Sequence, residues 1–78
     1  MKLEITTPDK TLFKGEVELV QLPGIDGSFE ILDNHAPMIS VLKKGYIKII
    51  IKKDEEDYYE VKGGVVEVLD DKVLVLAE

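Results

Sequence analysis

A period-two alternation of apolar and polar residues runs through most of this 78-residue chain. Ile47, Ile49 and Ile51 make one apolar face, with Lys48 and Lys52 on the reverse. Because successive side chains of a β-strand point to opposite faces, this pattern predicts half-buried strands rather than helices. The same alternation predicts apolar faces for Leu3 and Ile5, for Val17 and Leu19, for Tyr59 and Val61, and for Val66, Val68, Val73, Val75 and Ala77.

Polar and glycine-containing segments separate these runs and predict the connections between strands. Asp70-Asp71 is expected to form a short hairpin turn, and the run Asp-Glu-Glu-Asp at 54–57 a longer one. Gly63-Gly64 predicts a bend or bulge where the chain changes direction.

The number and length of these runs define the expected fold class. Only residues 34–42 offer a helical alternative, which Pro37 and the β-branched Ile39 and Val41 oppose. We therefore expect residues 1–78 to form a single all-β domain with about ten short strands. The expected architecture is a small sandwich of two antiparallel sheets, or a flattened barrel.

The composition excludes several classes of function. The net charge is −6, and all ten basic residues are Lys. A chain without Arg or a basic stripe is a poor nucleic-acid binder, and its acid excess disfavours docking on anionic lipids. The absence of Cys excludes disulfides and thiolate metal sites. No apolar run is long enough to span a bilayer and no signal peptide is recognisable, so we expect no direct membrane insertion.

The segment from Leu22 to Gly45 concentrates the special backbone residues of the chain. It reads LPGIDGSFEILDNHAPMISVLKKG and contains the only His and two of the three Pro residues. Gly and Pro occur where an ordinary residue would clash or where a turn must be fixed. Such a segment between strands forms either a corner of the fold or a binding edge.

Three parts of this segment, LPGIDGSFEIL, NHAPMIS and LKKG, resemble the signature of the epsilon subunit of F-type ATP synthases, called delta in mitochondria. The flanks LEITTPDKTLFKGEVELV and VKGGVVEVLDDKVLVLAE are similar to the first and last hairpins of that family, so the resemblance covers essentially the whole chain. It implies a β-sandwich of about ten strands. One departure is Glu30, which stands where the family most often has Gly.

The resemblance also implies a function and two contact regions. The expected role is that of a non-catalytic rotor subunit in the central stalk, without cofactor or metal, which links the gamma subunit to the proteolipid ring and so couples proton or sodium transport to ATP synthesis. The expected location is the cytoplasmic face of the inner (plasma) membrane, as a peripheral component. The gamma-facing residues implied by the NHAP match are His35, Ala36 and Pro37, with Thr7 and Ser40 as further candidates. The ring-facing residues implied by the LPG-x-x-G match are Asp26, Gly27, Ser28 and Phe29.

Many relatives in this family continue beyond the position of Glu78 into a two-helix hairpin. That hairpin carries the inhibitory behaviour of the family and, in some bacteria, an ATP site. Because the sequence stops at Glu78, we expect no C-terminal helical hairpin, and we carry neither function over.

His35 could suggest catalysis or metal binding, but a simpler structural role also accounts for it. Catalysis by His35, beside Asp33, would need a nucleophile within hydrogen-bonding reach, and no nucleophile-elbow motif surrounds Ser28 or Ser40. A metal site would need a second His or a Cys. We expect His35 to hydrogen-bond the backbone of its own corner or to contact a partner.

Two acidic or glycine-rich runs imitate ligand-binding loops. Residues 24–27 lack the basic neighbours and the following helix of a phosphate loop, so they predict a tight connection or an exposed tip. The four carboxylates at 54–57 lack the alternate spacing and the Gly of a calcium loop, so they predict a solvated tip.

Two alternative functions belong to other classes. Lys43 or Lys44 lies near mid-chain in LKKGYI, as does the modified Lys of lipoyl or biotinyl carrier domains, but without the expected Met-Lys-Met or Asp-Lys-Ala context. A free-standing ligand-binding β-module would require a concave pocket with convergent polar groups, for which the sequence gives no support.

Overall fold

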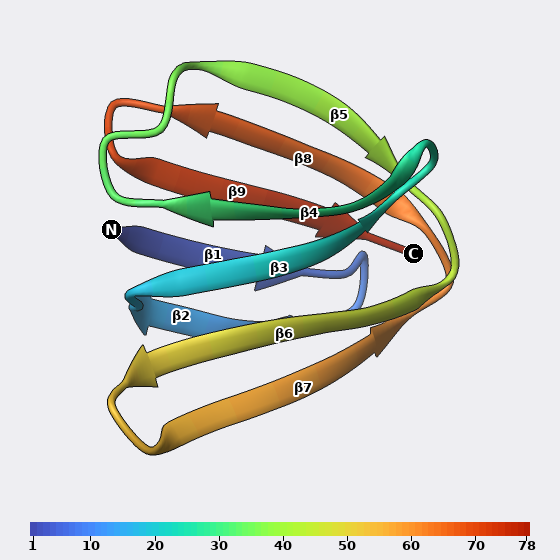
Figure 1. The fold of residues 1–78 in the computed structure, drawn as a ribbon. Coiled ribbons are helices and arrows are strands. Elements are labelled where there is room, and N and C mark those ends of the chain that lie inside the picture. Colours follow the sequence, from blue (N-terminus) through green and yellow to red (C-terminus); the bar gives the residue numbers. More distant parts are fainter.

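The computed structural model describes all 78 residues and contains nine β-strands and no helix (Figure 1). This confirms the all-β fold and the expected number of strands. The strands are β1 (Lys2–Thr6), β2 (Thr11–Glu16), β3 (Leu19–Gly24), β4 (Gly27–Leu32), β5 (Met38–Leu42), β6 (Gly45–Lys52), β7 (Glu55–Val61), β8 (Gly64–Leu69) and β9 (Lys72–Ala77).

The strands form two layers that face each other across the core. Strands β5, β8, β9, β1 and β2 are successive neighbours in one layer, and β4, β3, β6 and β7 in the other (Figure 1). The hydrogen-bonded path passes between the layers at a single pair, Gly24 of β3 with Leu42 of β5. The predicted sandwich is therefore a nearly closed sheet that folds over on itself.

One strand pair departs from the expected antiparallel arrangement. The first strand, β1, pairs in parallel with the last strand, β9, with Leu3 opposite Val73 and Ile5 opposite Val75. Parallel neighbours need a long connection, and here the whole of the intervening chain supplies it. A pattern of alternating residues carries no signal for this pairing, because it is the same in both directions.

The core consists of aliphatic side chains from both layers. It contains no buried polar side chain. The predicted inward faces are confirmed: those of β1, β8 and β9 are buried throughout, and those of β6 and β7 are buried except for the half-buried Ile51 and Tyr59. The buried apolar residues are Met1, Leu3, Ile5, Val17, Val20, Leu22, Ile31, Leu42, Ile47, Ile49, Val61, Val66, Val68, Val73, Val75 and Ala77.

Two sequence-based expectations about the strands are wrong in detail. Val17 and Leu19 do not share a face of one strand: Val17 and Val20 are buried and Leu19 is only half-buried. Val17 lies in the connection between β2 and β3, so the alternation starts afresh at β3. The run 54–57 is not a loop either, because β7 already begins at Glu55.

The backbone conformation explains why the connection between β6 and β7 is so short. Asp54 adopts a left-handed φ of 63°, which Asp tolerates better than most residues, and this closes the turn after Lys53. Glu55 then pairs opposite Lys52, and their side chains form an ion pair at 3.6 Å. The predicted Asp70-Asp71 hairpin is confirmed, with φ values of 52° and 61° that match the twist of a two-residue turn.

Gly64 is the glycine whose replacement should disturb the fold most. Its φ is 151°, and an added Cβ would lie 2.4 Å from the carbonyl oxygen of Leu76 on the neighbouring β9. We expect Gly64→Ala to lower the free energy of unfolding by at least about 3 kcal/mol, because backbone strain and a clash with main chain add together.

Gly27 provides the matched control for this prediction. Its φ is also positive, 130°, but an added Cβ would meet nothing within 4 Å. Gly27→Ala should cost only the strain, about 1 kcal/mol. Urea unfolding of both variants tests the difference; equal destabilisation would show that the close approach at Gly64 relaxes without penalty.

An aromatic pair lies where the outer strands of the two layers come together. Phe13 of β2 and Tyr59 of β7 have ring centroids 6.1 Å apart, although β2 and β7 share no ladder. Burial raises the pKa of the Tyr59 hydroxyl above its ordinary value of 10.0, and the charge of Asp57 raises it further. The side chains of this pair, not hydrogen bonds, join the two outer strands.

The raised pKa of Tyr59 predicts how stability depends on alkaline pH. The unfolded chain releases this proton more readily than the folded chain, so the contribution is fully present below pH 10 and is lost as the pH rises through the folded pKa. We expect the free energy of unfolding of the unsubstituted protein to fall more steeply above pH 10 than that of Tyr59→Phe. Tyr58→Phe, at an exposed neighbour, should leave the steep fall unchanged; parallel curves for all three proteins would contradict the prediction.

Candidate partner-binding surfaces

The strand connections gather at two opposite ends of the sandwich (Figure 1). One end carries the N-terminus and the β4–β5 connection, which includes His35, Ala36 and Pro37. The other end carries the β1–β2 turn with Thr7 and the β3–β4 tip with Asp26. The structure therefore keeps the implied gamma-facing and ring-facing motifs apart, but it places Thr7 at the end opposite His35.

His35 lies in an exposed corner and bonds to its own backbone. Its Nδ1 lies 2.7 Å from the carbonyl oxygen of Ala36, as the simpler hypothesis predicts. A carbonyl oxygen only accepts, so Nδ1 carries the proton and Nε2 faces outward without a protein partner. Asn34, with a φ of 64°, bends the chain immediately before His35. The corner presents an exposed polar surface and no nucleophile–base pair.

The start of this corner is attached to the first strand. The α-amino group of Met1 donates to Asp33 Oδ1 at 2.8 Å and to the carbonyl oxygen of Val17 at 3.1 Å, and it lies 3.4 Å from the Glu16 carboxylate. The hydrogen bond to Asp33 is the main cause that raises the pKa of this amino group above its ordinary value of 8.0. These contacts hold the β4–β5 connection against β1.

The β3–β4 tip is a two-residue turn that presents only part of the predicted set. Asp26, Gly27 and Ser28 are exposed, and Ser28 Oγ accepts a hydrogen bond from Gln21 Nε2 at 2.9 Å. Phe29 is half-buried and packs against the core. Its ring lies so close to Gly24 that a Cβ there would be 2.8 Å away, so Phe29 is not displayed as a free aromatic side chain.

Thr7 and Ser40 have local structural surroundings. Thr7 Oγ1 accepts from the backbone N–H groups of Asp9 and Lys10 and so shapes the β1–β2 turn. Ser40 is half-buried on β5, opposite the buried Val66 of β8. Neither side chain joins His35, so the gamma-facing set implied by the resemblance does not form one cluster.

An exposed apolar outer face is a feature that the sequence reasoning did not assign to a site. It covers the outer side of β5, β8 and β9, where β-pairing places Val41, Val65 and Leu76 side by side. The signal available in the sequence is that Leu69, Leu74 and Leu76 make the other side of β8 and β9 partly apolar as well. The exposed large residues of this face are Ile39 (71%), Val41 (50%), Val65 (38%), Leu69 (52%) and Leu76 (53%).

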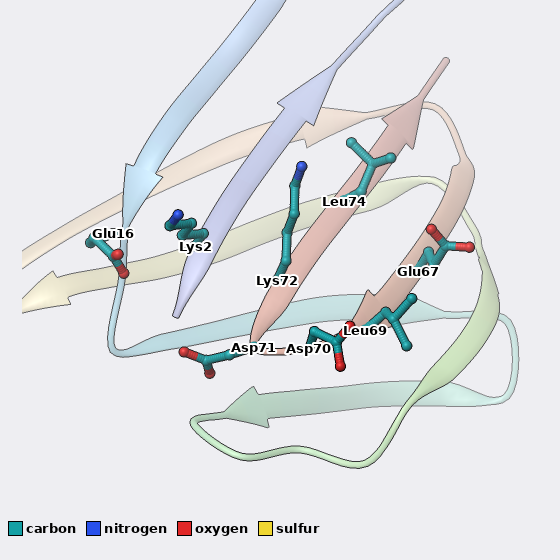
Figure 2. Close-up of a pocket in the computed structure, with 8 residues that line it drawn as sticks. All are labelled: Lys2, Glu16, Glu67, Leu69, Asp70, Asp71, Lys72 and Leu74. Carbon is teal, nitrogen blue, oxygen red and sulfur yellow. The ribbon is translucent and has the colours of Figure 1, made fainter.

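Two shallow hollows border this apolar face. The first is lined by Pro37, Met38, Ile39, Glu67, Val68 and Leu69, so the face is continuous with the His35 corner. Figure 2 shows the second, with Glu67 and Leu69 on one side, Lys2 and Glu16 on the other, and Lys72 and Leu74 between them. Acidic and basic side chains are mixed in it, and no group of three or more His, Cys, Asp or Glu residues in the molecule could hold a metal ion.

Lys43 and Lys44 occupy the connection between β5 and β6. Both side chains are exposed, and the backbone N–H of Lys43 donates to the carbonyl oxygen of Pro23 at 2.8 Å. The structure contains no helix long and apolar enough to cross a membrane.

Comparison with known proteins identifies the relatives of this chain. It is 42% identical to the ATP synthase epsilon chain of Chlorobium limicola, over 99% of this chain and 88% of that protein. It is 37% identical to the ATP synthase epsilon chain of Brevibacillus brevis, over 100% of this chain but only 59% of that protein. The chain therefore spans nearly all of some relatives and little more than half of others.

Solved structures show the same fold. A chain in the cryo-EM structure of the Euglena gracilis mitochondrial ATP synthase, described as OSCP/F1/c-ring, matches with a TM-score of 0.89 and 23% identity, over 96% of this chain and 48% of that one. A chain in the cryo-EM structure of the Tetrahymena thermophila mitochondrial ATP synthase, described as central stalk/c-ring, matches with a TM-score of 0.85 and 20% identity. The match covers 99% of this chain and 62% of that one.

The family assignment rests on the complete length of the chain. The family described as "ATP synthase, Delta/Epsilon chain, beta-sandwich domain" matches residues 1–78, which confirms the resemblance seen in the sequence motifs. Together with the relatives above, this match shows that the chain belongs to the delta/epsilon family of ATP synthase subunits.

Proposed function

We propose that this chain is a non-catalytic rotor subunit of the ATP synthase central stalk, which binds the gamma subunit with one surface and the proteolipid ring with another. The family match supports membership of the complex, and the similar solved chains come from central stalk and c-ring assemblies. In this role the subunit couples proton or sodium transport to ATP synthesis from the cytoplasmic face of the membrane. The matched family and the relatives described above do not support the alternative, a carrier domain modified on Lys43 or Lys44.

The observation that carries the proposal is the exposed apolar face of β5, β8 and β9. Five large aliphatic side chains are exposed there by 38–71% of their surface on three neighbouring strands, whereas the strands of the other layer expose one such aliphatic residue, Leu32, and two tyrosines, Tyr46 and Tyr58. Soluble monomers rarely leave contiguous apolar patches of this kind uncovered, and such patches mark protein interfaces. Because the face continues into Pro37 of the NHAP corner, it is the surface proposed to bind gamma.

The ring-facing region is the β3–β4 tip at the far end of the sandwich. Asp26 and Ser28 are exposed there, and Glu30 follows on the outward side of β4, opposite Gln21. Proteolipid loops of the family tend to be polar and are often basic, and we infer that these carboxylates supply complementary charge. A stiff body with contact regions at its side and at one end suits a part that transmits torque, because a close-packed core deforms little.

Replacement of Ile39 tests the gamma-binding face. We expect Ile39→Lys to abolish co-elution with the gamma subunit from the same genome in size-exclusion chromatography, because it places a charge in the centre of an apolar contact. Tyr58→Lys is the matched control, since Tyr58 is similarly exposed (56%) but lies on β7 of the other layer. Retained binding by Ile39→Lys and lost binding by Tyr58→Lys would assign gamma to the opposite face.

Replacement of Asp26 tests the ring-binding tip. We expect Asp26→Lys to weaken attachment to the ring and to reduce ATP-driven ion pumping by the assembled complex, because a basic side chain would then meet a basic loop. Asp9→Lys provides the same charge change at an exposed turn of the same end. Pumping that is unchanged by Asp26→Lys, or reduced equally by both variants, would count against a specific role of the tip.

A further inference from the structure

Glu67 is the one charged side chain at the centre of the apolar face. It lies on β8, where the flanking residues Val66 and Val68 point into the core, so Glu67 points outward. Across the sheet its neighbours are Ile39 of β5 and Leu74 of β9. The carboxylate therefore stands among apolar side chains in both directions across the layer.

The neighbours of Glu67 along β8 extend the same environment. Val65 and Leu69, two positions before and after it, lie on the same outer side, and both are exposed. Glu67 also contributes to both hollows that border the face, beside Ile39 in one and Leu74 in the other. Any surface that covers the face must therefore cover Glu67.

No basic group of this chain neutralises Glu67. The four ion pairs of the structure involve other carboxylates. The lysine on the outer side of β9 is Lys72, which pairs with Leu69 and whose side chain runs along β9 (Figure 2); it forms no ion pair with Glu67. In the free subunit the carboxylate is exposed, and water solvates it.

Docking would remove that water. Removing water from a carboxylate that gains no partner costs much free energy. A positioned cation of the partner offsets that cost and also fixes the register of the two surfaces. A purely apolar partner surface would thus fit the five exposed aliphatic residues of the face but would leave the Glu67 carboxylate buried without a partner. The arrangement selects a partner that carries one basic side chain within an apolar surface.

We propose that a Lys or Arg side chain of the gamma subunit forms an ion pair with Glu67 at the centre of this face. The inference rests on the proposed function and deepens it, because it states the chemistry that the partner must present. It makes Glu67 the specificity-determining residue of the contact, with the aliphatic residues around it excluding water.

The test measures the dissociation constant of the complex with gamma from the same genome. Loss of the carboxylate leaves the partner cation buried without its counter-ion, so we expect Glu67→Gln and Glu67→Leu each to weaken binding by roughly thirtyfold or more. Glu60→Gln is the matched control, on the exposed side of β7 in the other layer, and should leave the constant unchanged. Urea unfolding verifies that each variant is folded.

Charge reversal identifies the cation. Glu67→Lys should bind even more weakly than Glu67→Gln, and a single Lys→Glu or Arg→Glu change in gamma should restore much of that loss. If Glu67→Leu binds as tightly as the unsubstituted chain or more tightly, while Ile39→Lys does not bind, the ion pair is refuted and the docking face remains. If the unsubstituted chain does not bind folded gamma, the proposed function fails and this inference fails with it.

Discussion

The parallel pairing of β1 with β9 is the constraint on which the rest of the molecule depends. It joins residues 2–6 to residues 72–76, so the layer that carries the apolar outer face is complete only when both ends of the chain are in place. The same strand attaches the NHAP corner, since the Met1 amino group bonds to Asp33. One ladder thus supports both the apolar face, which we propose binds gamma, and the corner beside it. Burial of Leu3 and Ile5 opposite Val73 and Val75 makes that ladder part of the core.

Alternation predicted most strands because each has one buried side, and a period of two is what a half-buried strand imposes. Alternation failed where a connection interrupted the strand pattern, where a turn was shorter than expected, and where distant strands paired. The alternation restarts at β3 because Val17 lies in the connection before that strand. Strand β7 begins at Glu55 because the left-handed Asp54 closes the turn in fewer residues than the run of four carboxylates suggests. The parallel β1–β9 pair was missed because pairing between distant strands leaves no local mark in either one.

The candidate sites were predictable to different degrees. The motifs that carry the family resemblance indicated both the His35 corner and the Asp26 tip, and the structure places them at opposite ends of the sandwich. The role of Phe29 was less predictable, because its packing depends on the missing side chain of Gly24 across the hairpin. The apolar face was hidden in the sequence for another reason. In β8 and β9 both sides of the strands are largely apolar, and only the position of the second layer decides which side is covered.

An exposed apolar face is a hazard for a free subunit, and the charge distribution offsets it. The net charge of −6 keeps free copies apart, and β7, at one outer edge of the sandwich, carries Glu55, Glu56, Asp57 and Glu60, which discourage pairing with another strand. By contrast β5, which forms part of the apolar face, has no charged residue at all. The charge is thus kept largely away from the apolar face, with Glu67 as the exception. A single carboxylate there lowers the affinity for apolar partners that lack a basic group, and it costs less against a partner that supplies the matching cation.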